Sequence, residues 1–305
     1  MKLDRRNFMK KTVAGAAALT FSTAEMYARA DNDVSLRFGV IGVGNRARHH
    51  IKTINNLDGM QVAALCDVRP ERLTKGLNWV GNKVNTYDDY QKLLNDADIN
   101  AVIICTPNLY HKQMVIDSLD AGKYVMCEKP MAVSWDECIA IKKAEEASSV
   151  SVPVLYTMQL RYAYKYQETK SVLQSGKIGK PQYILLPEYR GDWAQVDRHN
   201  VWLYTRPETK KKINWRYDYR PSGGTLNKKM CHYFDIITWM AGHYPTAIKA
   251  NGGINHYEDN RDTWDHASVH IEYPHDVKAL ASLCMYAPHR LELQIIGDEG
   301  SLFLS

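Results

Sequence analysis

Apolar runs alternate with helix-like segments from residue 36 to about residue 159. The runs cover residues 36–41, 61–66, 101–105, 124–127 and 154–158. They are continuous and rich in β-branched residues, as expected of parallel strands that are buried on both faces. Segments of helical character separate them, at 46–56, 70–80, 87–95, 111–121 and 134–149. This alternation predicts an α/β domain of residues 31–160 built on a doubly wound Rossmann sheet.

The pattern changes after residue 160. A helix is predicted over 164–174, because Ser175-Gly176 forms a stop signal behind it, and a second over 229–240, ending at Ala241-Gly242. Strand-like stretches follow at 268–273, 278–286, 290–296 and 301–304. We therefore predict an α+β domain of residues 161–305 with an open, mostly antiparallel sheet and helices on one face. The sequence stops inside a strand-like stretch, which is consistent with a missing C-terminal portion.

The first thirty residues are predicted to be a signal peptide. Arg5-Arg6 lies in a twin-arginine motif, an apolar stretch at 12–21 follows it, and Ala28-Arg29-Ala30 is a small-x-small cleavage site. The apolar stretch is shorter than the roughly 20 residues that cross a bilayer. We therefore expect export to the periplasm through the twin-arginine pathway, with no membrane attachment after cleavage.

Most of the net positive charge lies in this signal peptide. The chain has 39 Lys and Arg against 34 Asp and Glu, a net of +5, and residues 1–30 contribute +4 of it. The remaining charge of about +1 (5 − 4) gives no reason to expect a nucleic-acid partner. Cys66, Cys105 and Cys127 each end an apolar run, which favours free thiols. The sequence has no CxxC pair and no HExxH motif, so we predict no metal site.

A dinucleotide-binding turn, Gly42-Val43-Gly44-Asn45-Arg46-Ala47, follows the first predicted strand. Gly42 permits the tight turn and Gly44 lets a pyrophosphate approach the backbone, where it would lie on the N-terminus of the next helix. We assign Asn45 and Arg46 to the same cofactor site. Asp67 ends the second predicted strand, where it can accept hydrogen bonds from ribose hydroxyls and repel a 2′-phosphate. NAD is therefore favoured, and Arg69 leaves NADP as the alternative.

Polar residues also follow the third predicted strand. Thr106, Pro107 and Asn108 lie at the carboxyl edge of the sheet, where ligands bind in open α/β folds. His111 comes next, at a helix start. Its spacing is more typical of helix entry than of a catalyst, although we include it with the cofactor residues.

Glu128-Lys129-Pro130 follows the fourth predicted strand and places an ammonium group at the same edge. Hydride transfer from a carbinol carbon requires loss of the hydroxyl proton, and a partly desolvated lysine beside a positively charged ring can take it up. Lys129 is therefore the predicted general acid/base, and Glu128 and Gln159 are assigned to the cofactor site. Outside this context, Lys129 would be interpreted as a solvated surface lysine.

Five motifs, in this order, resemble the Gfo/Idh/MocA oxidoreductase family. They are Gly42-Val43-Gly44, Cys66-Asp67-Val68-Arg69, Cys105-Thr106-Pro107-Asn108, Glu128-Lys129-Pro130, and Gly223-Gly224 with His232 and Asp235. The resemblance runs from about residue 36 to the end of the sequence. It implies NAD(P)-dependent oxidation or reduction of sugars, inositols or related polyols, without specifying which.

The resemblance makes Lys129 the central catalytic residue and puts His232 at the second catalytic position. His232 would share the substrate proton or polarise the substrate oxygen, although a lone histidine is often a structural residue of the core. Asp235 lies three residues later on the same helix face, where it would contact substrate, orient the helix or support His232.

One position departs from the family pattern. Four residues before the histidine the family commonly has Asp or Glu, whereas this sequence has Lys228 followed by Lys229. Lys228 is included with the catalytic residues. It would serve as an acid, bind an anionic substrate group or mark altered chemistry, and the sequence does not choose among these.

Aromatic and arginine residues after residue 160 are candidates for the substrate wall. Aromatic faces stack on sugar C–H surfaces, and arginine donates to hydroxyls or carboxylates. The candidates are Arg161, Arg190, Trp193, Trp215 and Arg216. Core packing or a subunit interface would explain each of them equally well.

The leading hypothesis is an NAD(P)-dependent oxidoreductase that acts on a carbohydrate CH–OH group. The first alternative is a glycosidase that oxidises a ring hydroxyl transiently with NAD, and the second is a catalytically altered carbohydrate-binding protein. An antiparallel sheet with an exposed face usually packs that face against another surface. The predicted sheet of the second domain therefore suggests a homo-oligomer, a dimer or tetramer, packed through its exposed face.

Overall fold

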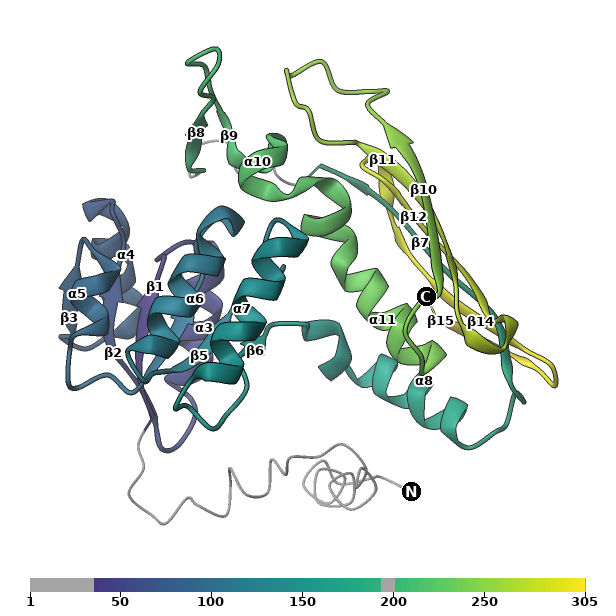
Figure 1. The fold of residues 1–305 in the computed structure, drawn as a ribbon, viewed down its shortest axis with the longest axis horizontal. Helices are drawn as coiled ribbons and strands as arrows, with labels where there is room; N and C mark the ends of the chain where they lie inside the picture. Colours follow the sequence, from purple (N-terminus) through teal and green to yellow (C-terminus); the bar gives the residue numbers. More distant parts are fainter. Residues whose placement is uncertain (1–35, 193–200, 305) are drawn as a thin grey trace.

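The computed structural model describes residues 36–192 and 201–304, which form two large sheets with helices packed on each (Figure 1). The predicted signal peptide and Trp193 lie outside these residues. Figure 1 shows the parallel sheet and its helices on the left and the second sheet on the right, with α11 (Cys231–Ala241) between them. No helix in the described ranges is long and apolar enough to span a membrane.

The N-terminal sheet has parallel strands in the order β3-β2-β1-β4-β5-β6. They are β1 (Leu36–Ile41), β2 (Met60–Cys66), β3 (Asn85–Tyr87), β4 (Ala101–Ile104), β5 (Tyr124–Cys127) and β6 (Leu155–Tyr156). β1 pairs with both β2 and β4, so the direction of strand order reverses there. That reversal is the place where open α/β sheets bind ligands, beyond the carboxyl ends of the strands.

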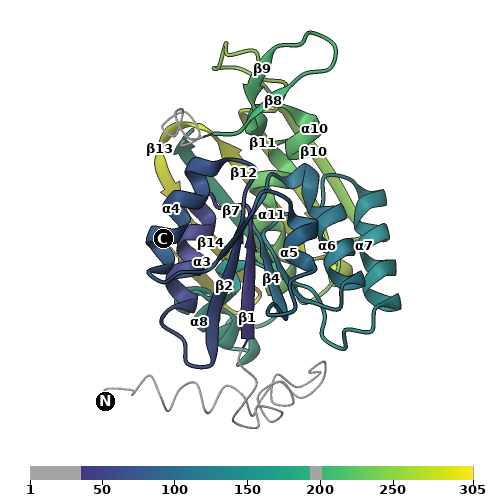
Figure 2. The same ribbon diagram turned by 90° about the vertical axis from the view of Figure 1, so that its left-hand side faces the viewer.

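Helices cover both faces of this sheet (Figure 2). On one face lie α3 (Asn45–Ile54) and α4 (Pro70–Val80), and their Ile51 and Val80 are buried with Leu65 of β2. On the other lie α5 (Tyr90–Leu94), α6 (His111–Asp120) and α7 (Trp135–Ala147). Val115 of α6 and Ile141 of α7 are buried with Val102 of β4. Two buried faces explain why the strands appear as continuous apolar runs.

The C-terminal sheet follows the order β10-β11-β12-β7-β14-β15, and β13 also pairs with β7. Its strands are β7 (Pro181–Gly191), β10 (Ala247–Gly253), β11 (His266–Glu272), β12 (Lys278–Cys284), β13 (Tyr286–Leu291), β14 (Leu293–Gly297) and β15 (Ser301–Leu304). β12 and β7 run parallel, and the other neighbours run antiparallel. The predicted fold class, a Rossmann sheet followed by a mostly antiparallel α+β domain, is therefore confirmed.

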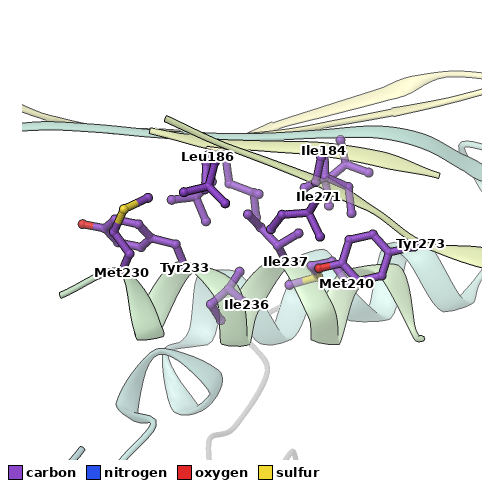
Figure 3. Packing of buried hydrophobic residues seen from close by; sticks show 14 of the residues in the cluster. Ile184, Leu186, Met230, Tyr233, Ile236, Ile237, Met240, Ile271 and Tyr273 are labelled. Atoms are coloured by element: carbon purple, nitrogen blue, oxygen red, sulfur yellow. The ribbon is translucent and has the colours of Figure 1, made fainter. Parts of the chain in front are cut away.

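One face of the C-terminal sheet packs on α11, and α8 (Tyr164–Gln174) adds to the same core. Figure 3 shows Ile184 and Leu186 of β7 extending toward Tyr233 and Ile237 of the helix. All four side chains are at most 1% exposed. Burial of each such side chain stabilises the fold by about 1.5–3 kcal/mol.

Several elements differ from the sequence expectation. β7 is a central strand that the sequence pattern does not predict, because Pro181, Pro187 and Gly191 mask the strand pattern. β3 ends at Tyr87, where the sequence predicts the start of a helix over 87–95. The helix begins instead at Tyr90. β10 and the hairpin of β8 (Leu203–Thr205) and β9 (Lys212–Asn214) were not predicted.

The helix predicted from residue 229 begins at Cys231, after a π-helical turn at Leu226–Met230. This segment contacts the N-terminal domain directly. The Asn227 amide donates to the Ala132 carbonyl at 2.7 Å, and Asn108 donates to the Ser222 carbonyl at 2.8 Å. The turn therefore holds Lys228 and Lys229 against the carboxyl edge of the parallel sheet.

Candidate functional site

A cavity of about 720 Å³ runs along this carboxyl edge. One end is lined by the glycine turn and Asp67, and the other by Lys129, Trp215 and Lys228. Both domains therefore contribute to a single cleft. Every predicted cofactor residue except His111 lines it.

The glycine turn has the backbone geometry that a dinucleotide needs. Gly42 has a φ of +87°, and a Cβ there would lie 2.9 Å from the Thr106 nitrogen. A Cβ at Gly44 would meet no atom within 4 Å, so the space beside the turn is open. Gly44 caps α3 without a side-chain hydrogen bond, which leaves N–H groups at the helix N-terminus for an anion. This cradle fits the pyrophosphate of NAD.

Asp67 is fixed at the end of β2, next to the turn. Its carboxylate accepts the backbone N–H of Val43 at 2.9 Å and that of Arg69 at 3.0 Å. The Arg69 guanidinium lies 3.9 Å from Asp67 and equally far from Glu71, so its charge is divided between two carboxylates. An oriented carboxylate beside the cradle suits the ribose hydroxyls of NAD and disfavours a 2′-phosphate.

Glu128 is the centre of a hydrogen-bond network on the wall of the cleft. It accepts hydrogen bonds from Arg46 and His50, and Arg46 also donates to Gln159. Burial would raise the pKa of Glu128, but the His50 and Arg46 hydrogen bonds outweigh it and hold the pKa at about 2. The carboxylate is ionised at neutral pH and ties α3 to the end of β5, and so fixes the backbone that presents Lys129.

Lys129 extends into the cleft from a cis Lys129-Pro130 peptide. Its Nζ donates to the backbone carbonyl of Lys228 at 2.8 Å. An ammonium group has three donors, so this contact orients Lys129 and leaves donors for a substrate oxygen. The tertiary structure thus brings Lys129 into direct contact with Lys228, the residue that stands where the family commonly has Asp or Glu.

His232 lies on the first turn of α11, close to the lysines. Burial, together with the charges of Lys129 and Lys229, lowers the pKa of its imidazole to about 3, so the ring is neutral at pH 7. Its Nδ1 is buried and has no hydrogen-bond partner within the described ranges. His232 does not itself line the cavity.

Lys228 lines the cavity and donates to the Arg216 carbonyl at 2.8 Å. Burial lowers the pKa of Lys228 to about 7; Arg216 and Lys129 act in the same direction, and Asp192 opposes them. Its neighbour Lys229 instead pairs with Glu188 at 3.0 Å.

The predicted substrate wall is only partly assembled. Arg190, Trp215 and Arg216 line the cavity. Arg161 and Asp235 instead face one another, with Arg161 Nε and one terminal nitrogen both donating to the carboxylate at 2.7–3.0 Å. This pair joins the segment before α8 to α11. Neither residue lines the cavity.

His111 is placed beneath the cleft. Its ring nitrogens lie 2.8 Å from the Pro130 carbonyl and 3.1 Å from the Thr106 carbonyl, and the side chain is fully buried. This position braces the two loops that carry Thr106 and Lys129.

Sequence reasoning missed several residues of the cleft. His50, one helical turn after Arg46 on the same face of α3, shares Glu128 with it beside the cleft. Trp202 lines the cavity and meets Tyr110 edge-on at 5.7 Å. Asp192 also lines it, backed by Arg261 at 3.0 Å. No local signal marks Trp202 or Asp192, since they reach the cleft only through the tertiary fold.

Metal chemistry has no visible support at this site. Across the part of the chain that the structure describes, no three His, Cys, Asp or Glu side chains are arranged to hold a metal ion. The six cysteines are unpaired thiols.

Comparisons with known proteins agree with the geometry. Residues 36–156 match the model for the oxidoreductase family with an NAD-binding Rossmann fold (GFO_IDH_MocA), and residues 166–303 match the GFO/IDH/MocA C-terminal domain. Inositol 2-dehydrogenase of Salmonella typhimurium is 31% identical over 166 residues, 52% of this chain and 49% of the relative. A glycosyl hydrolase family 109 protein of Shewanella pealeana is 34% identical over 271 residues, 79% of this chain and 59% of that protein. The chain thus spans about half the length of the first curated relative and somewhat more of the second.

The fold also matches solved structures. Scyllo-inositol dehydrogenase of Lactobacillus casei, solved with bound NAD(H) and scyllo-inositol, superposes with a TM-score of 0.76 at 20% identity, over 89% of this chain and 76% of that one. The two family models together cover most of the sequence. The chain therefore belongs to the Gfo/Idh/MocA family of oxidoreductases and carries its NAD-binding Rossmann domain.

Proposed function

We propose that the protein is an NAD-dependent oxidoreductase that transfers a hydride between nicotinamide and a CH–OH group of a sugar or polyol. The observation that carries this proposal is the placement of Lys129. Its ammonium lies in the same cleft as the dinucleotide cradle, and its carboxylate neighbour Glu128 is locked beneath it.

The chain's own residues provide the proton chemistry. Gly44, the α3 N-terminus and Asp67 would hold NAD, which supplies the hydride acceptor when bound. Lys129 would act through its Nζ, which takes the hydroxyl proton in the oxidation and returns it to the carbonyl oxygen in the reverse direction. The Lys228 carbonyl, 2.8 Å from Nζ, orients the lysine throughout.

Neutral His232 would assist as a hydrogen-bonding group. Because its pKa is lowered to about 3, it does not add a positive charge near Lys129 at pH 7. Its unpartnered Nδ1 could accept a hydrogen bond from a substrate hydroxyl, provided that substrate binding exposes it.

The test is NADH formation by the purified mature protein with a panel of sugars and polyols. We expect Lys129→Met to reduce kcat by at least about 100-fold, the scale of general acid–base catalysis, with unchanged affinity for NAD. Lys143→Met is the matched control, because Lys143 is exposed on α7 and outside the cavity. Full activity of Lys129→Met would refute the proposed role.

A redox-neutral glycosidase is the second candidate. It is favoured by the Shewanella glycosyl hydrolase family 109 relative, which matches 79% of this chain at 34% identity. Such an enzyme would oxidise a ring hydroxyl, remove a proton from the next carbon, release the aglycone, add water and return the same hydride. Cleavage of a nitrophenyl glycoside without net NADH would support it over the dehydrogenase. Activity in neither assay would favour a carbohydrate-binding protein.

Export and assembly are separate proposals. We infer export through the twin-arginine pathway from Arg5-Arg6, and periplasmic fractionation of an Arg5→Lys, Arg6→Lys variant tests it. We also infer a homo-oligomer formed through the outer face of the C-terminal sheet. There Leu280, Leu185, Gln294 and Phe303 follow one another in a row across the strands, and Phe303 is 62% exposed. A monomeric mass in solution would contradict the second inference.

A further inference from the structure

The π-helical turn at Leu226–Met230 places a second lysine beside Lys129. The backbone carbonyl of Lys228 accepts the Lys129 Nζ at 2.8 Å, and the Lys228 Nζ donates to the Arg216 carbonyl at 2.8 Å. Both lysines line the same end of the cavity. Irregular helical turns of this kind often occur at functional sites. An amine therefore stands next to the proposed proton acceptor.

The proposed oxidation does not use this second amine. Only the hydroxyl proton is lost when the hydride leaves a CH–OH group, and Lys129 is assigned to take it. The ketone that forms makes the C–H of the neighbouring carbon acidic, so that a base at the same end of the cleft can remove its proton. A second base would therefore add a second reaction to the site.

Lys228 has the properties of such a base. Burial lowers the pKa of Lys228 to about 7; Arg216, Lys129 and Arg261 act in the same direction, and Asp192 opposes them. A neutral amine has two N–H groups and one lone pair, so the Arg216 carbonyl can hold one N–H while the lone pair faces substrate. After Lys228 takes a proton, the charge of Asp192 stabilises the ammonium.

The carboxylates on this wall are engaged by cations. Glu128 accepts hydrogen bonds from Arg46 and His50, which hold its pKa at about 2. Asp192 pairs with Arg261 at 3.0 Å, and both side chains are 1% exposed. Neither carboxylate is therefore placed to take a proton from substrate.

The remaining ionisable groups that line this wall are also unsuited. Burial lowers the pKa of Lys229, but Glu188 opposes this shift and its two oxygens engage the Lys229 Nζ at 3.0 and 3.3 Å. Burial raises the pKa of the Tyr110 phenol above its usual value, so the phenol stays protonated at neutral pH. Arginine side chains stay charged in proteins. Among the described residues of this wall, these contacts leave Lys228 as the second base.

We propose that Lys228 is a second acid–base residue, which removes a proton from the carbon next to the one that is oxidised. The Lys228 Nζ takes the proton, the C–H electron pair forms a C=C bond, and the ketone oxygen becomes an enolate that the Lys129 ammonium stabilises. Return of a proton and then of the hydride restores the substrate, so no further oxidant is consumed. The inference rests on the proposed function, because that oxidation forms the ketone.

Deuterium exchange measures this step separately from the oxidation. The protein is incubated with NAD in D₂O together with myo-inositol, methyl glucosides or methyl galactosides. Proton NMR follows each ring C–H signal, and absorbance follows bound and free NADH. We expect deuterium to replace the hydrogen next to the oxidised carbon, because the Lys228 ammonium exchanges with solvent before it returns a proton.

The outcomes separate this inference from the proposed function. NADH formation without deuterium incorporation would overturn the role of Lys228 and leave the dehydrogenase intact. Deuterium incorporation with little accumulated NADH would support the inference and favour a redox-neutral enzyme. The absence of both signals with all these compounds would count against both proposals.

Two variants test whether the amine itself is the base. Lys228→Met removes the amine, and Lys228→Arg keeps the charge but cannot be deprotonated. In both, the ratio of deuterium incorporation to NADH formation should fall at least about 100-fold, the scale of general base catalysis. Lys143→Met, on the exposed face of α7, is the control and should keep the wild-type ratio. A wild-type ratio in either folded Lys228 variant would refute the base role.

The pH dependence of the wild-type protein gives a test that needs no variant. The amine form of Lys228 predominates above its pKa, so the ratio of deuterium incorporation to NADH formation should rise as the pH passes about 7. A ratio that stays constant across this range would contradict the proposal even if neither variant folds.

Discussion

Alanine substitutions at Gly42 and Gly44 should have opposite consequences. A side chain at Gly42 requires a φ of +87°, which costs an ordinary residue about 1–2 kcal/mol. Its Cβ would also lie 2.9 Å from the Cys105 carbonyl carbon and the Thr106 nitrogen, and moving that backbone costs about 1–3 kcal/mol more. Gly42→Ala should therefore lose about 2–5 kcal/mol of stability. At about 2–4 °C per kcal/mol, its Tm should fall by roughly 5–15 °C.

Gly44→Ala should leave the fold intact and disrupt cofactor binding. The backbone there is extended, with a φ of −93° and a ψ of −170°, and an added Cβ meets no atom within 4 Å. The open space is the cradle that the pyrophosphate would fill, so the methyl group competes with the ligand rather than with the protein. We expect a Tm within about 2 °C of wild type, because surface substitutions of this kind change stability little.

Thermal unfolding with and without NAD distinguishes the two. NAD at about 100 times its Kd should stabilise the wild-type protein by about 2.7 kcal/mol, and so raise its Tm. The apo protein must first be prepared, since bound cofactor would hide the effect. Gly44→Ala should have a near-normal apo Tm and little shift with NAD. A normal NAD shift in that variant, or a wild-type apo Tm in Gly42→Ala, would refute the assignment of the cradle.

Three further predictions concern the residues around the cleft. The pKa of Glu128 is lowered from 4.5 to about 2. Its contribution of about 3 kcal/mol to the free energy of unfolding is therefore present above pH 4.5 and is lost as the pH falls toward 2. Glu128→Gln should flatten the dependence of Tm on pH in that range. Arg161→Met and Asp235→Asn should show a coupling energy of about 1 kcal/mol in a double-mutant cycle of urea unfolding. If either single variant changed KM by more than about threefold, the placement of both residues away from the substrate would be contradicted. His111→Phe should lose about 1–3 kcal/mol of stability, because a buried carbonyl loses its hydrogen-bond donor. Its affinity for NAD, measured by calorimetry at low temperature, should stay within about threefold of wild type.

The cofactor half of the site was largely predictable because its signals are local. A glycine turn after an apolar run, and Asp67 at the end of the next one, place the same residues at one sheet edge whenever parallel strands form. Sequence spacing alone could not say that Glu128 would be pinned by both Arg46 and His50, since these contacts join residues about 80 positions apart. His111 also shows the limit, because a polar residue at a strand edge can point beneath the cleft as well as into it.

The substrate half was harder to predict because its walls come from distant segments. Arg190, Trp215 and Lys228 lie on a strand, a short 3₁₀ turn and a π-helical turn, and they meet only when β7 takes its central place in the second sheet. β7 itself was obscured by its prolines and terminal glycine. Arg161 and Asp235 illustrate the converse: two charges that the sequence suggests for substrate binding are paired with each other.

The sequence by itself determined the family, the parallel sheet and the position of the cofactor cradle. These depend on residue periodicity and on the backbone freedom of a few glycines, which are properties of short segments. The tertiary structure alone decided which charges neutralise one another. Glu188 pairs with Lys229 and Arg190, and Asp192 pairs with Arg261. These pairings follow from side-chain distances across three chain segments. These pairs join residues that are far apart in the sequence, so no local pattern in the sequence encodes them.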